Sequence, residues 1–237
     1  TVWVNVRAAP GLGKSALLTQ AGRELRSTGE PTAVVRSRAD ATRRVPPYGT
    51  LEPIVRQLMS TVDLPGPDLQ SPGLAAVAPH LATRDNVDRL ASLEVSRVEQ
   101  AADTFLSRLV SAAAADSLVA VVIDDLHDAD EQSLRAIGRL LASQDALALL
   151  VLTAQRPADT AGNLALDAIA EEVAREHRFV QLTLSPLSLE ESIELGSALR
   201  VDPAQTDAII KAGGNPLVIQ WIADGSGDHD VSRFVRS

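Results

Sequence analysis

Hydrophobic residues near the start of the chain follow two successive periods. Val2, Val4 and Val6 alternate within an almost wholly apolar stretch, a pattern that favours a buried strand. Glycines follow at positions 11 and 13, and residues 15–26 then carry apolar side chains at helical spacing. The order strand, glycine loop, helix is therefore the first prediction.

The same two periods recur further along the chain. Strands are predicted over residues 32–35, 118–123, 146–153 and 179–184. Residues 118–123 are all apolar, which suits a central strand, whereas residues 179–184 alternate as an edge strand does. Helices are predicted over residues 51–58, 90–115, 131–141 and 164–176, and residues 64–79 form an irregular stretch with room for one short helix.

After Pro186 the pattern changes to short helices alone, predicted over residues 189–199, 203–212 and 216–223. Strands that alternate with helices predict a parallel sheet covered on both faces. We therefore expect an α/β core over residues 1–185 and a smaller, incomplete helical subdomain over residues 186–237.

The composition narrows the class of protein. The 237 residues are 45% hydrophobic and 22% charged, enough for a real core, which excludes a disordered chain. The net charge of -9 and the aromatic content of 3% argue against direct contact with a nucleic-acid backbone and against base stacking. No apolar run approaches the roughly 20 residues that span a bilayer, so no membrane contact is expected.

Cysteine usage and the chain ends bear on location. The absence of cysteine excludes disulfides, thiolate catalysis and cysteine zinc sites, and it fits a cytoplasmic protein. No charged leader precedes the first strand, so the N-terminus lacks the pattern of a signal peptide. Because the chain opens inside a strand, we expect it to be a piece of a larger protein.

The first candidate site is the loop of residues 8–15, AAPGLGKS. It matches the phosphate-binding pattern G-x-x-x-x-G-K-[ST], except that Ala8 stands at the first glycine. Such a loop turns backbone N–H groups toward phosphate oxygens at a helix N-terminus, with Lys14 reaching the β and γ phosphates and Ser15 placing its hydroxyl on Mg²⁺. The plainer alternative is a strand-to-helix turn in which Ser15 caps the helix.

Ala8 is a departure whose cost depends on its backbone. If this position needs a positive φ, alanine costs on the order of 1 kcal/mol, whereas an extended backbone accepts alanine without cost. The sequence leaves both possibilities open.

Two acids end the strongest predicted strand. Asp124 and Asp125 follow residues 118–123, where a P-loop site needs one carboxylate near Mg²⁺ and one to orient or deprotonate the attacking water. We assign the metal role to Asp124 and the water-activating role to Asp125. The alternative is two polar residues that merely end a strand.

Further acids follow at Asp128, Asp130 and Glu131. A two-metal carboxylate site is one interpretation. Acids that complement the dipole at the start of the next helix are the simpler one. His127 has no partner pattern typical of a metal site, so a packed or hydrogen-bonded histidine is favoured.

Two polar segments complete the candidates. Thr153 and Arg156 stand at the end of a predicted strand, where ligands bind in open parallel sheets, so either is a candidate sensor of the γ-phosphate. A solvated arginine is the alternative. Residues 213–216, GGNP, read as a helix stop followed by proline at the first position of a new helix.

Taken in order, these segments resemble the STAND class of P-loop ATPases, a branch related to AAA+ proteins. They are similar in particular to the ATPase module of large ATP-binding LuxR-type bacterial transcription regulators. The resemblance spans nearly the whole chain. It is carried by APGLGKSALL (residues 9–18), PYGTLEPIVRQL (47–58), VVIDDLHDADEQSL (121–134), LTAQRP (152–157), LSPLSLEE (184–191) and GGNPLVI (213–219).

The resemblance implies a three-layer α/β/α P-loop NTPase fold with a five-stranded parallel sheet and a helical lid. It also implies ATP or ADP with Mg²⁺ as cofactors. By position, Ser15 and Asp124 match metal-binding residues, and Asp125, Lys14 and Arg156 match catalytic residues, Arg156 as a sensor. The nucleotide-binding residues are Pro10, Gly11, Leu12, Gly13, Lys14, Ser15, Ala16 and Pro216, the last packing on the adenine.

This sequence departs from the family pattern at three positions. Ala8 replaces the first P-loop glycine, Asp128 stands where an aromatic residue is common, and Ala154 replaces a frequent threonine. The first departure is expected to affect ATP hydrolysis more than nucleotide binding.

The leading functional hypothesis is a slow, Mg²⁺-dependent switch ATPase module of a multidomain bacterial signalling or transcription regulator. The alternative, motivated by Ala8, is a degenerate nucleotide-binding oligomerisation scaffold without significant hydrolysis. A P-loop kinase is less favoured because the helical tail has no evident acceptor site. The partners implied are self-association or other domains of a larger chain, and any DNA binding is expected from a domain outside this segment.

Overall fold

Five parallel strands form one sheet in the computed structural model, which describes residues 1–30, 32–40, 46–142, 147–157, 164–175 and 178–225, without the side chains of residues 164–168 and 172. The spatial order is β2-β3-β4-β1-β5. The predicted five-stranded parallel sheet is confirmed, with the strand of residues 118–123 inside the sheet and that of residues 179–184 at its edge. The strands are β1 (Val2–Arg7), β2 (Thr32–Arg38), β3 (Leu118–Asp124), β4 (Leu149–Gln155) and β5 (Phe179–Thr183).

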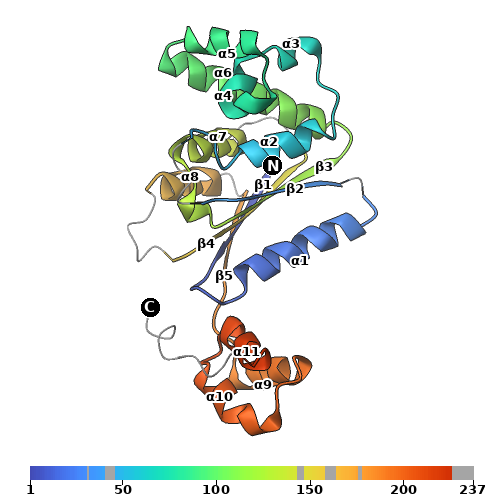
Figure 1. Cartoon of the computed structure of the whole chain (residues 1–237), viewed down its shortest axis with the longest axis vertical. Coiled ribbons are helices and arrows are strands. Elements are labelled where there is room, and N and C mark those ends of the chain that lie inside the picture. Colours follow the sequence, from blue (N-terminus) through green and yellow to red (C-terminus); the bar gives the residue numbers. More distant parts are fainter. Residues whose placement is uncertain (31, 41–45, 143–146, 158–163, 176–177, 226–237) are drawn as a thin grey trace.

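Helices cover both faces of the sheet, as predicted for a three-layer α/β/α fold (Figure 1). One helix, α1 (Lys14–Ser27), lies against one face. The opposite face is covered by α2 (Glu52–Met59), α6 (Val95–Ala113), α7 (Glu131–Ala142) and α8 (Leu164–Arg175). An outer group packs around α6 and consists of α3 (Gly66–Leu69), α4 (Pro72–Val77), the 3₁₀ turn η2 (Pro79–Leu81) and α5 (Arg84–Ala91).

Strand alternation divides the hydrophobic core between these two faces. Val6, Val122, Leu152 and Ala154 point to one side and bury Leu18 of α1. The other side forms the larger cluster, with Trp3 and central strand residues packed under α2, α6 and α7. The sheet is thereby fixed from both sides, and its carboxyl edge carries the polar loops.

Three of the sequence predictions for helices need correction. Residues 90–115 do not form one long helix, because α5 ends at Ala91 and α6 begins at Val95. The stretch of residues 64–79 holds α3 and α4 rather than one short helix, and residues 203–212 divide into the 3₁₀ turn η4 (Pro203–Gln205) and α10 (Thr206–Lys211). Thr83 caps the start of α5 and Asp202 caps the start of η4, whereas α6 and α10 begin without a side-chain cap.

A separate helical unit follows β5 and lies at the opposite end of the molecule from the outer helices (Figure 1). It consists of α9 (Leu189–Ala198), η4, α10 and α11 (Pro216–Ala223) and has its own apolar cluster around Ile209, Ile219 and Ile222. The division into domains at residues 185 and 186 stays a prediction. Residues 226–237 of the second domain lie outside the described part of the chain.

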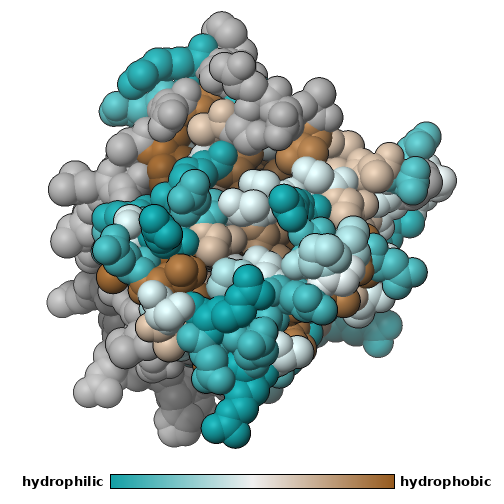
Figure 2. Space-filling model, turned by 90° about the horizontal axis from the view of Figure 1, so that it is seen from above, coloured by the Kyte–Doolittle hydropathy of each residue, from teal (hydrophilic) through white to brown (hydrophobic). Residues whose placement is uncertain are grey.

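The surface over the outer helices mixes hydrophilic and hydrophobic residues, as Figure 2 shows from above. Its exposed large hydrophobic residues include Leu69, Val87 and Val95. No described helix combines the length and the apolar character that crossing a bilayer requires.

Candidate functional site

The turn between β1 and α1 lies on the side of the core that faces α9–α11 (Figure 1). Gly11 and Gly13 have φ values of 80° and 88°, a left-handed backbone that glycine adopts without steric cost. Gly13 occupies the N-cap position of α1, and no side chain caps this helix. The alternative with Ser15 as the cap is therefore wrong, and the N–H groups of the first turn are not used by a capping side chain.

Lys14 closes this turn from within. Its side chain is buried, and its Nζ donates to the carbonyl oxygens of Ala8 at 2.7 Å and Ala9 at 3.0 Å. Burial lowers the pKa of Lys14; the nearby carboxylate of Asp125 opposes this, and Arg156 adds to it. The ammonium group thus lies within electrostatic reach of residues that follow two other strands.

Ala8 fits its position without backbone strain. Among the described non-glycine residues, positive φ values occur at Tyr48, Asp125 and Arg200, so Ala8 is not one of them. Its side chain is buried, and its N–H group donates to the carbonyl oxygen of Gln155 at 3.3 Å. Of the two possibilities that the sequence left open, the structure has the one in which alanine costs little.

The two predicted functional acids lie at the end of β3. Asp124 is the last residue of the strand, and Asp125 turns the chain with φ of 53° and ψ of 40°. The Asp124 Oδ1 accepts the N–H group of Asp125 at 3.0 Å. Asp124 and the exposed Ser15 line one cavity of 300 Å³, so a hydroxyl and a carboxylate oxygen, ligands that suit Mg²⁺, open onto the same space.

Asp125 has a partner that the sequence did not indicate. The Arg38 guanidinium donates to Asp125 Oδ2 from Nε at 2.9 Å and from Nη2 at 2.7 Å. Arg38 is the last residue of β2, and the register of β2 with β3 places it opposite Asp124. Only the sheet order, which the sequence pattern does not state, could have revealed this pairing.

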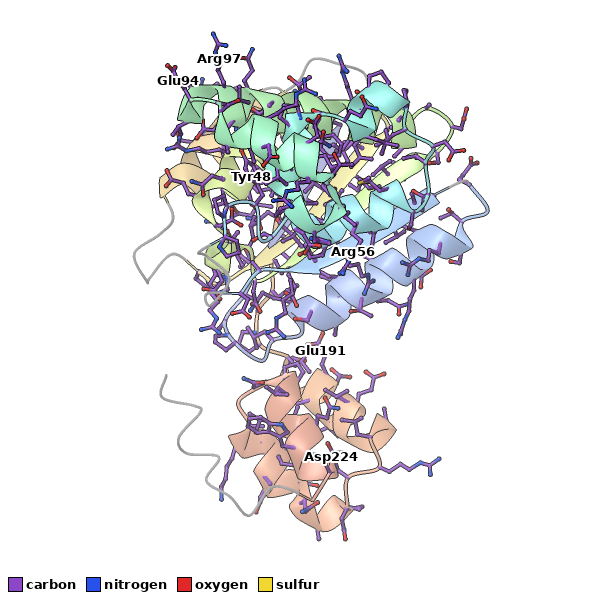
Figure 3. All side chains as sticks on the ribbon, turned by 45° about the horizontal axis from the view of Figure 1, so that its top comes forward. Tyr48, Arg56, Glu94, Arg97, Glu191 and Asp224 are labelled. Atoms are coloured by element: carbon purple, nitrogen blue, oxygen red, sulfur yellow. The ribbon has the colours of Figure 1, made fainter. Side chains whose placement is uncertain are left out.

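A cleft of 730 Å³ opens beside this ion pair. Arg38, Asp125 and Asp128 line it together with Arg56, which α2 presents at the side of the core (Figure 3), and with Arg156 from the end of β4. The structure therefore brings Asp125, Lys14 and Arg156 together, as expected for residues at the carboxyl ends of parallel strands.

Thr153 does not reach this cleft. It is fully buried, and its hydroxyl accepts a hydrogen bond from Trp3 Nε1 at 2.8 Å and donates one to Asn5 Oδ1 at 3.0 Å. A side chain used in this way inside the sheet has no contact to offer a phosphate. Arg156, exposed at the cleft, is the candidate sensor that the geometry favours.

Asp130 has a larger structural role than a helix-dipole acid. It is 2% exposed, and its carboxylate accepts three backbone N–H groups, from Tyr48 at 2.8 Å, Thr50 at 3.0 Å and Ser133 at 2.8 Å. It thereby caps the start of α7 and holds the loop before α2. Figure 3 shows Tyr48 among the helices on this face.

The other acids of this segment do not make a metal centre. Glu131 begins α7, as predicted, whereas Asp128 lies in the 3₁₀ turn η3 (Leu126–Asp128) with His127 at 3.5 Å. Burial lowers the pKa of His127. In the part of the chain that the structure describes, no group of three or more histidine, aspartate or glutamate side chains is placed to hold a metal ion.

The GGNP segment reaches the glycine loop between β1 and α1. As predicted, Pro216 is the first residue of α11, and Asn215 is its N-cap. The Asn215 Nδ2 donates to the Pro10 carbonyl at 3.2 Å, and the Leu217 N–H donates to the Gly11 carbonyl at 3.3 Å. Pro216 stands between the two contacting residues, beside the loop.

A family model described as an AAA ATPase domain matches residues 3–152. Among solved structures, the ORC2 protein of Aeropyrum pernix, determined as ADPNP and ADP complexes, has 15% sequence identity and a TM-score of 0.51. The match covers 94% of this chain and 54% of that one. At this identity the likeness supports the fold.

Two further solved structures are similar at lower scores. A STAND protein with a tetratricopeptide repeat sensor from Pyrococcus horikoshii has 12% identity and a TM-score of 0.49, over 100% of this chain and 30% of that one. AMPPCP-bound DnaA from Aquifex aeolicus has 11% identity and a TM-score of 0.44, over 92% and 52%. This chain thus spans about half or less of the proteins it resembles. No curated protein matches it in sequence.

Proposed function

Because the chain belongs to the AAA ATPase domain family, we propose that it is a nucleotide-dependent switch that binds ATP or ADP at residues 8–16. The observation that carries the proposal is the turn between β1 and α1. Its glycines hold a left-handed backbone, its helix begins without a side-chain cap, and Lys14 lies inside it. Together these leave N–H groups of the first helical turn without a capping side chain beside the Lys14 ammonium group, an arrangement that suits phosphate.

The residues around the turn supply the remaining parts of a hydrolytic site. We assign Ser15 and Asp124 to Mg²⁺, because both open onto one cavity and both offer oxygen ligands. When bound, Mg²⁺ neutralises phosphate charge and polarises the γ-phosphoryl group. Asp125 accepts a proton from the attacking water and orients it, and Arg156 senses the γ-phosphate from the cleft.

We assign α9–α11 the role of a lid, and call it the lid below. The contact of α11 with residues 10 and 11 supports this role, and Pro216 beside the loop is assigned to the adenine. Nucleotide binding then changes the position of the lid, and ADP holds a resting state. On the sequence resemblance, we also propose that the chain is the STAND-type ATPase module of a multidomain bacterial regulator of the LuxR type, which associates with itself or with other domains.

The experiment that tests the proposal is equilibrium binding of ATP and ADP, with and without Mg²⁺, to the wild type and to Lys14→Ala. The chain has a built-in control, because its other lysine, Lys211, is exposed at the end of α10. We expect Lys14→Ala to weaken binding by about tenfold or more, since a charge-assisted contact to phosphate is lost. Lys211→Ala is expected to bind as the wild type does.

Equal binding by all three proteins, or none by the wild type, would contradict the proposal. Steady-state phosphate release then separates a hydrolysing switch from the alternative of a binding scaffold. Release by the wild type supports the switch, and tight binding without release supports the scaffold.

A further inference from the structure

Asn215 joins the lid to the phosphate-binding loop by using both ends of its amide. The nitrogen donates to the Pro10 carbonyl at 3.2 Å, while Oδ1 accepts the backbone N–H groups of Leu217 at 3.1 Å and Val218 at 3.4 Å. These partners fix which amide atom is the oxygen, because N–H groups need an acceptor and a carbonyl needs a donor. The same side chain therefore caps α11 and holds the loop.

Gly11 leaves room for the close approach of the Asn215 side chain. A β-carbon at position 11 would lie 2.5 Å from Asn215 Oδ1 and 2.7 Å from its Nδ2, and the residue has a φ of 80°. Glycine is thus required here for the close approach of the lid as well as for the backbone. The Leu217 N–H group, which donates to the Gly11 carbonyl at 3.3 Å, adds a second link at the same point.

The lid presents Asn215 from a fixed loop. Gly214, with a φ of 76°, packs so closely on Leu187 that a β-carbon there would clash with the Leu187 backbone. The Leu187 N–H group donates to the Gly214 carbonyl at 2.8 Å. Because Leu187 belongs to the segment that leads from β5 into α9, the asparagine is held from both sides.

The geometry of the peptide group determines where the N–H groups of the loop point. A planar trans peptide points its N–H and C=O groups in opposite directions. The carbonyl of Pro10 shares a peptide with the Gly11 N–H, and the carbonyl of Gly11 shares one with the Leu12 N–H. Holding the two carbonyls toward the lid turns the two N–H groups away from it. The Leu12 N–H accordingly makes a long contact of 3.5 Å with the Ala9 carbonyl inside the loop.

We propose that Asn215 is a positioning residue of the nucleotide site. It presets the N–H groups of Gly11 and Leu12 for phosphate and links their orientation to the position of the lid. The inference rests on the proposed function for the identity of the ligand, a nucleoside phosphate. The presetting itself is a property of the nucleotide-free protein.

The test is Asn215→Asp, which keeps an oxygen to cap α11 but places a second oxygen against the Pro10 carbonyl. The matched control is Ser188→Ala, which removes the cap of α9 in the same lid. Ser188 Oγ accepts the Glu191 N–H at 3.2 Å, and the side chain of Glu191, the residue labelled in Figure 3, completes this capping box. We expect Asn215→Asp to raise the dissociation constants of ATP and ADP by about tenfold. Ser188→Ala is expected to leave them within about twofold.

A second readout needs no nucleotide. Hydrogen exchange of the Leu12 amide, which donates to the Ala9 carbonyl, is expected to be faster in Asn215→Asp and unchanged in Ser188→Ala. A shorter cap, Asn215→Ser, is expected to behave like Asn215→Asp and covers the case in which the aspartate unfolds the lid. Exchange at Leu12 that is the same in wild type and both Asn215 variants would overturn the inference. If the wild type binds no nucleotide but exchange changes as expected, the proposed function fails and the positioning role stands.

Discussion

The turn that holds Asp125 and the loop that holds Asp130 differ in where their carboxylates find partners. Asp125 pairs with Arg38, whose side chain is 74% exposed, at the edge of an open cleft. Asp130 is buried, and both of its carboxylate oxygens accept hydrogen bonds from backbone N–H groups. A carboxylate enclosed by backbone donors stabilises the fold, whereas one that shares a cleft with an exposed partner is still able to meet a substrate.

The largest effect in this comparison is expected from Asp130→Ala. The N–H groups of Tyr48, Thr50 and Ser133 would lose their acceptor inside the protein. We expect the free energy of unfolding to fall by about 4 kcal/mol. Urea unfolding measures it. Asp130→Asn keeps one oxygen acceptor and is expected to lose about half as much. A loss below about 1 kcal/mol for the alanine variant would show that Asp130 is no more structural than Asp125.

The pH dependence of Tyr48 tests the same buried loop. Burial, with smaller contributions from the charges of Asp103 and Glu99, raises the pKa of Tyr48 to about 12. The unfolded chain releases this proton near pH 10, so above that pH the unfolded state is favoured and stability falls as pH rises toward 12. Over this pH range the free energy of unfolding is expected to fall by about 3 kcal/mol.

Tyr48 is the single tyrosine of the chain, so phenolate absorbance follows it without interference. We expect a midpoint well above that of free tyrosine in the folded protein and an ordinary midpoint in urea. An ordinary midpoint in both conditions would show that the loop held by Asp130 is open to solvent.

The next effect separates activity from stability. Asp125→Asn removes the proposed proton acceptor, so phosphate release is expected to fall by about 100-fold. Its unfolding free energy is expected to change by less than about 1 kcal/mol, because the carboxylate borders a cleft. The crossed control is Asp130→Asn, which is expected to lose stability while its folded fraction hydrolyses ATP at the wild-type rate. Reversal of these two outcomes would exchange the roles of the two acids.

The smallest effect is expected at Arg38. Its ion pair with Asp125 is short, but the Arg38 side chain is 74% exposed against 16% for Asp125, and a pair with one so exposed partner contributes little to stability. We expect Arg38→Ala to change the free energy of unfolding by less than about 0.5 kcal/mol, with the difference vanishing at high salt. A loss comparable with that of Asp130→Asn would mean that the Arg38 pair supports the fold.

The local elements of the site could be predicted from the sequence. The glycine loop between a buried strand and a helix, the acids after residues 118–123, and the start of α11 at Pro216 all lie where the pattern predicts them. Each depends on residues within a turn or two of one another, through backbone conformation or helix starts. The start of α5 at the Thr83 cap was missed, and the starts of α6 and α10 were missed because neither has a side-chain cap that a sequence pattern could show.

The contacts that give these residues different roles could not be predicted from the sequence. Arg38 and Asp125 are 87 positions apart, Tyr48 and Asp130 82, and Pro10 and Asn215 205. No local pattern specifies such pairs, because they follow from the order of strands in the sheet and from the packing of the lid. The fate of Thr153 is a further case, since its hydroxyl is consumed by Trp3 and Asn5.

The sequence by itself determined the fold class, the glycine loop between β1 and α1 and the acids at the end of β3, because short-range spacing and hydrophobic periodicity govern them. Only the tertiary structure decided that Ala8 is unstrained, that Asp130 is structural and that Asn215 holds the loop. The physical reason is that a polar group acts according to its burial and its partners, and both are set by residues distant in the chain.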